Sequence, residues 1–349
     1  MATRNSSPPP YVGDIRAQPA TLQLVLDAGL PGDGLEVLSR LDDFDRIVLT
    51  GMGSSLQALY PTYLRLAAAG LPVWFEDTAE LLGYQHGLLT PRTLLWITSQ
   101  SGESAEVVEL LSRLARPGVS PGPPTVLGVT NDLHSTLATT SSVVIPLHSG
   151  DEQTVGTRSY MNTLALCALA TAAALNEAPD SELLDAPSVL AADLDEWDTQ
   201  RHAIDDAVPD EPTFVLGRGA SLASARTGAL IMKEAARRPL EGMSVPQFRH
   251  GPLEMAGPAV TVLLLAGDRA DIVHNEKMRT DLRATGARCV WVDTEPQEGP
   301  AILMPRVVGR CARSLAEILP LQLLTVALAA RTGDEPGRFR QIGKITRTL

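Results

Sequence analysis

Aromatic residues make up only 4% of this 349-residue chain, so the sequence offers few stacking surfaces for bases or long polysaccharides. Positive charge is also scarce, because 29 lysines and arginines face 41 aspartates and glutamates, for a formal net charge of −12. Nucleic acids and anionic membranes both require a basic face, so neither is an expected partner. Any phosphate that this chain binds must be held by local amides, hydroxyls and helix dipoles.

Cysteines and long apolar runs are equally few. Cys167, Cys289 and Cys311 are far apart in the sequence and odd in number, which is typical of thiols in a reducing compartment. The longest apolar runs, near residues 160–175 and 319–330, are shorter than the ~20 residues that a membrane span needs. The first ten residues contain no apolar signal-peptide core. We therefore expect a cytoplasmic protein without membrane contact.

The chain also lacks a GxxxxGK[ST] phosphate loop, an HExxH pair, a GxSxG elbow and any cluster of histidines or cysteines. No metal site and no cofactor are expected on these grounds.

What the sequence does contain is an alternation of short apolar runs with longer helical patterns, which indicates βαβ units on a parallel sheet. The expected strands are 46–50, 73–75, 94–98, 125–129 and 143–146, then 213–216, 260–265 and 289–292. The expected helices are 55–69, 103–114 and 160–175, then 221–236, 275–285 and 311–330. Between the two sets, the acidic stretch 180–198 is predicted to form a solvated connecting helix.

The second set of expected strands and helices repeats the pattern of the first set. Gly51-Met52-Gly53-Ser54-Ser55-Leu56 is echoed by Gly217-Arg218-Gly219-Ala220-Ser221-Leu222, an offset of 166 positions between residues 51 and 217. We predict two tandem doubly wound α/β domains of flavodoxin-like type, each a three-layer α/β/α structure. The predicted boundaries are a disordered tail at 1–13, a first domain at 14–180, a connecting helix at 181–206, a second domain at 207–331 and a C-terminal tail at 332–349.

The glycine turn at 51–53 leads from a strand to a helix start, where unpaired amides favour an anion. A dinucleotide fingerprint needs a third glycine, but Leu56 and Leu222 occupy that position in the two copies. A purely structural tight turn remains an alternative for this motif taken alone.

A second motif, Ser99-Gln100-Ser101-Gly102-Glu103-Ser104, follows the apolar strand that ends at Thr98. Hydroxyls, an amide and a helix start can satisfy phosphate oxygens without a basic side chain. The alternative is a polar turn with a serine N-cap. At the repeat offset Ser99 corresponds to Leu265, so one phosphate site per chain is expected.

These two motifs, together with Val129-Thr130-Asn131 and Leu216-Gly217-Arg218-Gly219, resemble the sugar isomerase (SIS) domain family. The similarity extends from Asp14-Ile15-Arg16-Ala17-Gln18-Pro19 to Gly343-Lys344-Ile345-Thr346, and within the family it is greatest to the isomerase half of glucosamine-6-phosphate synthases.

The resemblance implies a role for several residues. Positions that hold the sugar phosphate are matched by Ser55, Ser99, Gln100, Ser101 and Ser104, and positions that line the sugar by Ser54 and Val155. Glu234 matches the carboxylate that moves a proton between C1 and C2, His250 the ring-opening histidine, and Lys344 the tail lysine that engages the open-chain carbonyl. In relatives the histidine comes from the partner subunit, so a homodimer is implied.

Some positions depart from the synthase pattern. Thr227 and Ile231 stand where the synthase has a glutamate and a lysine, and the loop Glu152–Arg158 is one residue shorter, with Arg158 near the position of its lysine. No glutamine-hydrolysing domain is expected before Asp14. The expected activity is therefore deamination and isomerisation of an amino sugar 6-phosphate, by ring opening and C1–C2 proton transfer. Alternatives are a fructosamine-6-phosphate deglycase and a non-catalytic sugar-phosphate sensor.

Overall fold

Five parallel strands form the first sheet in the computed structural model of the chain, which describes residues 9–116, 122–209, 212–307, 309 and 312–349. The strands are β1 (Arg46–Gly51), β2 (Val73–Asp77), β3 (Thr93–Thr98), β4 (Thr125–Thr130) and β5 (Val143–Pro146). Their order is β2-β1-β3-β4-β5, so the chain reverses its direction of winding between β1 and β3. Ligands bind at such a switch point in open parallel sheets, beyond the carboxyl ends of the strands.

Helices surround this first sheet. They are α1 (Pro10–Arg16), α2 (Gln18–Ala28), α3 (Gly32–Leu38), α4 (Gly53–Ala58), α5 (Tyr60–Ala68), α6 (Thr78–Tyr84), α7 (Ala105–Leu114), α8 (Thr136–Thr140) and α9 (Arg158–Ala174), with 3₁₀ turns at Leu41–Asp43 and His86–Leu88.

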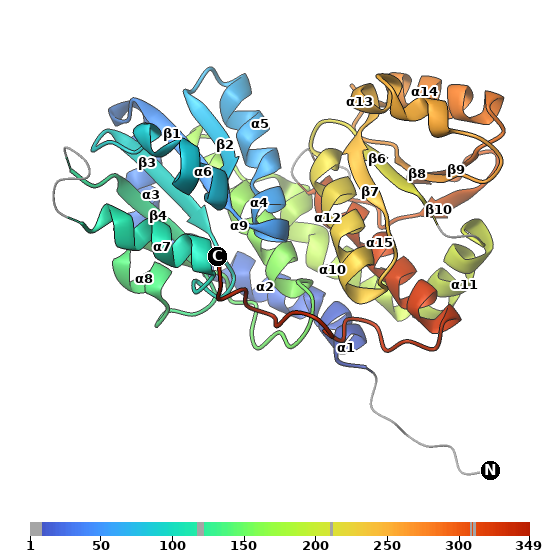
Figure 1. Cartoon of the computed structure of the whole chain (residues 1–349), viewed down its shortest axis with the longest axis horizontal. Coiled ribbons are helices and arrows are strands. Elements are labelled where there is room, and N and C mark those ends of the chain that lie inside the picture. The colour runs from blue at the N-terminus through green and yellow to red at the C-terminus, as the bar shows by residue number, and fades with distance from the viewer. Residues whose placement is uncertain (1–8, 117–121, 210–211, 308, 310–311) are drawn as a thin grey trace, which may run out of the picture.

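The second sheet is also five-stranded and parallel. Its strands are β6 (Phe214–Gly217), β7 (Glu241–Ser244), β8 (Thr261–Leu265), β9 (Arg288–Asp293) and β10 (Ala301–Leu303), in the order β10-β9-β8-β6-β7. The remaining helices are α10 (Ser181–Asp195), α11 (Trp197–Ala207), α12 (Ser221–Ala235), α13 (Val245–Arg249), α14 (Ile272–Ala284) and α15 (Arg313–Arg331), with a 3₁₀ turn at Pro252–Met255. Read from β7 to β10, the strand order has the same pattern as in the first sheet, and the two sheets lie in separate lobes (Figure 1).

The lobes share one continuous core. A single cluster of buried apolar side chains runs from Ile47 and Leu127 of the first sheet to Val215 and Val290 of the second. Helices α9, α12 and α15 fill the space between the sheets (Figure 1). An apolar helix that is covered on all sides belongs in such a core. This explains α15, which is long and apolar enough to cross a membrane by composition but is 89% buried over that window.

The structure differs from the sequence prediction near the N-terminus. Residues 10–13, expected in a disordered tail, belong to helix α1, where Tyr11 is fully buried. Residues 1–8 lie outside the described part of the chain. The Tyr11 hydroxyl accepts a hydrogen bond of 2.9 Å from Thr325 of α15, so distant packing, and not local propensity, holds this helix.

Two predicted helices are divided in the structure. The segment 55–69 breaks at Leu59 into α4 and α5, because Pro61 in the first turn of α5 has no amide hydrogen to continue the earlier helix. The connecting segment 181–206 breaks at Glu196 into α10 and α11. Helix α10 is not simply solvated, since it buries Leu183 and Leu190 against the core.

Candidate active site

A cavity of about 310 Å³ opens at the carboxyl ends of β1 and β3. It brings together the predicted phosphate-binding, sugar-lining and catalytic residues Ser54, Ser55, Ser99, Gln100, Ser101, Ser104, Val155, Glu234 and Lys344. They come from the first lobe, from α12 and from the C-terminal segment, so three distant parts of the sequence build one cavity.

The serine-rich loop at 99–104 is held by its own hydroxyl groups. Ser99 Oγ lies 3.2 Å from Ser104 Oγ and accepts a hydrogen bond of 3.2 Å from the Gly102 amide. Ser101 Oγ accepts one of 3.2 Å from the Glu103 amide. Ser104 precedes α7 but makes no side-chain cap to it. The hydroxyls therefore converge on the cavity beside a helix start that no serine caps, which is a suitable arrangement for an anion.

Glycine is required twice in this region. Gly102 has a φ of +64°, and a Cβ there would lie 2.1 Å from Ser135 Oγ. A Cβ on Gly51 would lie 2.7 Å from the carbonyl oxygen of Thr98, because β1 and β3 pair at this level. Only a residue without a side chain allows such positive φ and such close backbone approach.

Glu234, near the end of α12, contributes one of the carboxylates of the cavity. It is partly buried, and desolvation raises the pKa of this carboxyl from 4.5 to about 7. A carboxyl group with a pKa near neutrality can both accept and return a proton, which is the requirement for general acid–base catalysis.

Lys344 reaches the cavity from the other end of the chain. After α15 the C-terminal segment runs back from the second lobe and ends beside the first (Figure 1). There the Ala105 amide at the start of α7 donates a hydrogen bond of 3.0 Å to the Thr346 carbonyl. The Lys344 ammonium lies 3.1 Å from Glu152 Oε2 and also donates to the Glu152 carbonyl oxygen. The tail is thus tied to the start of α7 and to Glu152 in the cavity lining.

Glu152 is a cavity residue to which sequence reasoning assigned no role. It was noted only as the first residue of the shortened loop 152–158. Its carboxylate is buried and accepts hydrogen bonds from the amides of Thr157 and Ser159 at the start of α9. A glutamate a few residues before a Thr-x-Ser helix start is a weak signal for this arrangement, because anions are favoured at helix N-termini. Thr98, Glu106, Thr154 and Ser159 also line the cavity and were not predicted as site residues.

Three of the positions that depart from the synthase pattern, Thr227, Ile231 and Arg158, lie outside the cavity lining, whereas the shortened loop before Arg158 forms part of it. Thr227 and Ile231 are fully buried in α12. Arg158 pairs with Asp14 of α1 at 2.8 Å, and the two side chains are 12% and 9% exposed. Because Thr154 also donates to Asp14, these contacts hold the loop 152–158 against α1.

His250 is not brought into this cavity. It follows α13 in the second lobe and is exposed. Its predicted ring-opening role requires the cavity of a neighbouring subunit and stays a prediction.

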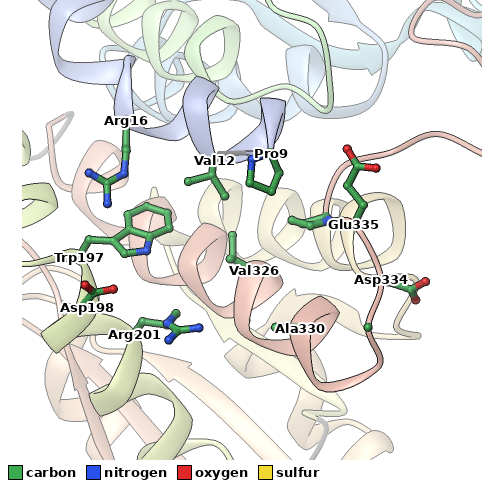
Figure 2. A pocket seen from close by; sticks show the side chains of 12 residues that line it. Pro9, Val12, Arg16, Trp197, Asp198, Arg201, Val326, Ala330, Asp334 and Glu335 are labelled. Carbon is green, nitrogen blue, oxygen red and sulfur yellow. The ribbon is translucent and has the colours of Figure 1, made fainter. Parts of the chain in front are cut away.

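A second, larger groove of about 810 Å³ lies between α1, α11, α15 and the start of the C-terminal segment (Figure 2). In this groove the Arg16 guanidinium lies over the Trp197 ring, 4.8 Å from its centre. The groove contains none of the predicted site residues (Figure 2). The smaller cavity is therefore the candidate active site, because donors and a carboxylate converge there. Within the described residues, no cluster of three or more His, Cys, Asp or Glu is placed to hold a metal ion.

Comparison with known proteins identifies relatives of this chain. Residues 41–176 match the SIS domain family. The chain is 29% identical over 324 residues to a glutamine–fructose-6-phosphate aminotransferase (isomerizing) of Pyrococcus horikoshii, which covers 88% of this chain and 53% of that protein. This chain therefore spans about half the length of the curated relatives it matches.

Solved structures match along nearly the whole chain. The C-terminal domain of glucosamine-fructose-6-phosphate aminotransferase from Francisella tularensis has a TM-score of 0.84 at 20% identity, covering 97% of this chain and 100% of that one. A glucosamine-6-phosphate deaminase from Thermotoga maritima has a TM-score of 0.74 at 17% identity, covering 96% and 99%. At these identities the structural matches establish a common fold.

Proposed function

Because residues 41–176 of this chain are a SIS domain, related to the isomerase domain of glutamine–fructose-6-phosphate aminotransferases, we propose that the chain is a phosphosugar isomerase and deaminase acting on an amino sugar 6-phosphate. The observation that carries the proposal is the convergence of the serine loop, Glu234 and Lys344 on one cavity. A second copy of the same domain at 207–331, a homodimer and a cytoplasmic location are further parts of the proposal.

The phosphate would be bound by the hydroxyls of Ser55, Ser99, Ser101 and Ser104 and by the side-chain amide of Gln100. These neutral donors line the cavity, and the start of α7 directly after Ser104 adds a favourable dipole for an anion. Such a site works in a chain with a net charge of −12, because it depends on short-range hydrogen bonds and not on a positive surface.

The reaction would begin with opening of the sugar ring, for which His250 of a neighbouring subunit is the proposed acid–base group. Glu234 would then take the proton from C2 and deliver it to C1, which converts the 2-amino group to an imine. Water hydrolyses the imine, so an amino sugar phosphate and one water give a ketose phosphate and ammonia. Lys344, an ammonium group in the same cavity, would hydrogen-bond to the open-chain carbonyl oxygen.

The test is release of ammonia and of ketose 6-phosphate from glucosamine 6-phosphate by the intact chain. We expect turnover by the wild type and a loss of about 10² to 10⁴-fold in Glu234→Gln, the usual contribution of a general acid–base group. Binding of the substrate by that variant, measured by calorimetry, should be retained.

Other outcomes separate the alternatives. Release of an amino acid from a fructosamine 6-phosphate, without ammonia from glucosamine 6-phosphate, would indicate a deglycase. Tight binding of hexose 6-phosphates without any turnover, unchanged by Glu234→Gln, would indicate a sensor and overturn the proposed activity.

A further inference from the structure

Glu152 is the most firmly held charged side chain in the cavity. Its side chain is 1% exposed, and four donors surround it at the start of α9. The Thr157 amide and hydroxyl donate to Oε1 at 2.8 and 3.1 Å, and the Ser159 amide donates to the same oxygen at 3.1 Å. The Ser159 hydroxyl donates to Oε2 at 2.7 Å. The carboxylate therefore has one fixed position, set by a helix that is itself buried in the core.

Lys344 is the opposite kind of partner. It belongs to a segment without helix or strand, and its side chain is 23% exposed. A free lysine side chain samples many rotamers, so its ammonium stays at one place only if a fixed group holds it. Glu152 Oε2, 3.1 Å away, and the Glu152 backbone carbonyl are both such groups.

We propose that Glu152 is a positioning residue that holds the ammonium of Lys344, and with it the C-terminal segment, at the reacting end of the cavity. The inference rests on the proposed function, in which Lys344 meets the open-chain carbonyl. Glu152 does not itself contact the substrate in this proposal. It acts through the lysine, since the rigid carboxylate determines where the mobile cation lies.

A purely structural role makes a different prediction. If Glu152 only satisfied the start of α9, its loss would reduce activity by disturbing α9, whether or not Lys344 were present. A double-mutant cycle separates the two cases, because residues that act through one another lose their effects together.

The experiment compares Glu152→Gln, Lys344→Met and the double variant on glucosamine 6-phosphate. Each single substitution should lower kcat by about 10- to 100-fold, the cost of a misplaced catalytic group, with a smaller change in KM. Glu152→Gln should have less than about a twofold further effect in the Lys344→Met background. Glu152→Asp, which keeps the charge, should recover part of the activity.

Thr157→Val is the matched control, because it removes a donor to Oε1 without altering Oε2 or the charge. It should leave kcat within about twofold of the wild type. The proposal is wrong if the kcat losses of the two single variants multiply in the double variant. It is also wrong if Thr157→Val loses as much kcat as Glu152→Gln. Either result would show that Glu152 serves α9 and not Lys344.

A second readout does not depend on turnover. Hydrogen exchange of the backbone amides of residues 339–346 should become faster in Glu152→Gln and stay unchanged in Thr157→Val, in protein saturated with glucose 6-phosphate. If the wild type proved inactive but the two variants still differed in hydrogen exchange, the proposed activity would be wrong and the positioning role of Glu152 correct. Unchanged exchange in Glu152→Gln would overturn the positioning role even in an active enzyme.

Discussion

Replacing Glu234 by glutamine should make the ligand-free protein more stable at high pH and leave its stability almost unchanged at low pH. Burial raises the pKa of the Glu234 carboxyl from 4.5 to about 7, so the folded protein disfavours its charged form. Below pH 4.5 the carboxyl is neutral in the folded and unfolded chain, and the two variants should behave alike. Between pH 4.5 and about 7 the unfolded chain ionises this carboxyl while the folded chain keeps it protonated, so the wild type loses stability that the glutamine variant keeps, and above pH 7 the difference is constant.

The magnitude follows from the size of the change in pKa. A rise from 4.5 to about 7 is equivalent to about 3 kcal/mol of unfolding free energy at most. Because Glu234 is partly exposed, solvent reduces this, and we expect about 1–2 kcal/mol above pH 7. For a chain of 349 residues, that corresponds to about 1–3 °C in Tm.

The assay is thermal unfolding of both proteins from pH 4.5 to 8.5 without ligand. Glu109→Gln is a suitable control, because a hydrogen bond from Arg113 lowers the pKa of that exposed carboxyl and the expected change has the opposite sign. If the Tm advantage of Glu234→Gln did not grow between pH 5 and 8, the carboxyl would not be desolvated. Its assignment as a proton shuttle with a near-neutral pKa would then be refuted.

Two further substitutions test the architecture around the cavity. Gly102→Ala places a Cβ at positive φ and 2.1 Å from Ser135 Oγ, so urea unfolding should show a loss of about 2–4 kcal/mol and calorimetry should show weaker binding of glucose 6-phosphate. Unaltered binding would mean that the loop conformation does not determine the phosphate site. Asp14→Asn leaves Arg158 buried without its carboxylate and should cost about 2–3 kcal/mol in the same unfolding assay. Adding Arg158→Met should restore part of this loss, and a cost below about 0.5 kcal/mol would show that the ion pair does not hold α1 in place.

Much of the first lobe could be predicted from local sequence. A buried strand reads as an apolar run, and β3 followed by the hydroxyl cluster at 99–104 shows both the strand and the site at its end. The second lobe was predicted less completely. Strands β7 and β10 were missed because Glu241–Ser244 has no apolar run and Ala301–Leu303 has only three residues. Segment β7 is a strand because it pairs with β6, and β10 is a strand because it pairs with β9.

The fold brings only some of the predicted catalytic residues into the cavity, and local sequence does not show which ones. Glu234 and Lys344 were assigned by resemblance, and their meeting in one cavity with the serine loop depends on contacts across the whole chain. His250, assigned in the same way, lies outside that cavity, after α13 in the second lobe, and its role in the cavity of a second subunit stays a prediction.

Sequence by itself determined the α/β class of the fold and the cluster of hydroxyls at 99–104, since apolar periodicity and clustered hydroxyls act between neighbouring residues. Only the tertiary structure decided that α1 is ordered by Thr325 and that Glu152 faces Lys344, 192 residues away. It also decided the near-neutral pKa of Glu234. Each of these is a consequence of burial, and burial depends on which distant side chains the fold brings together.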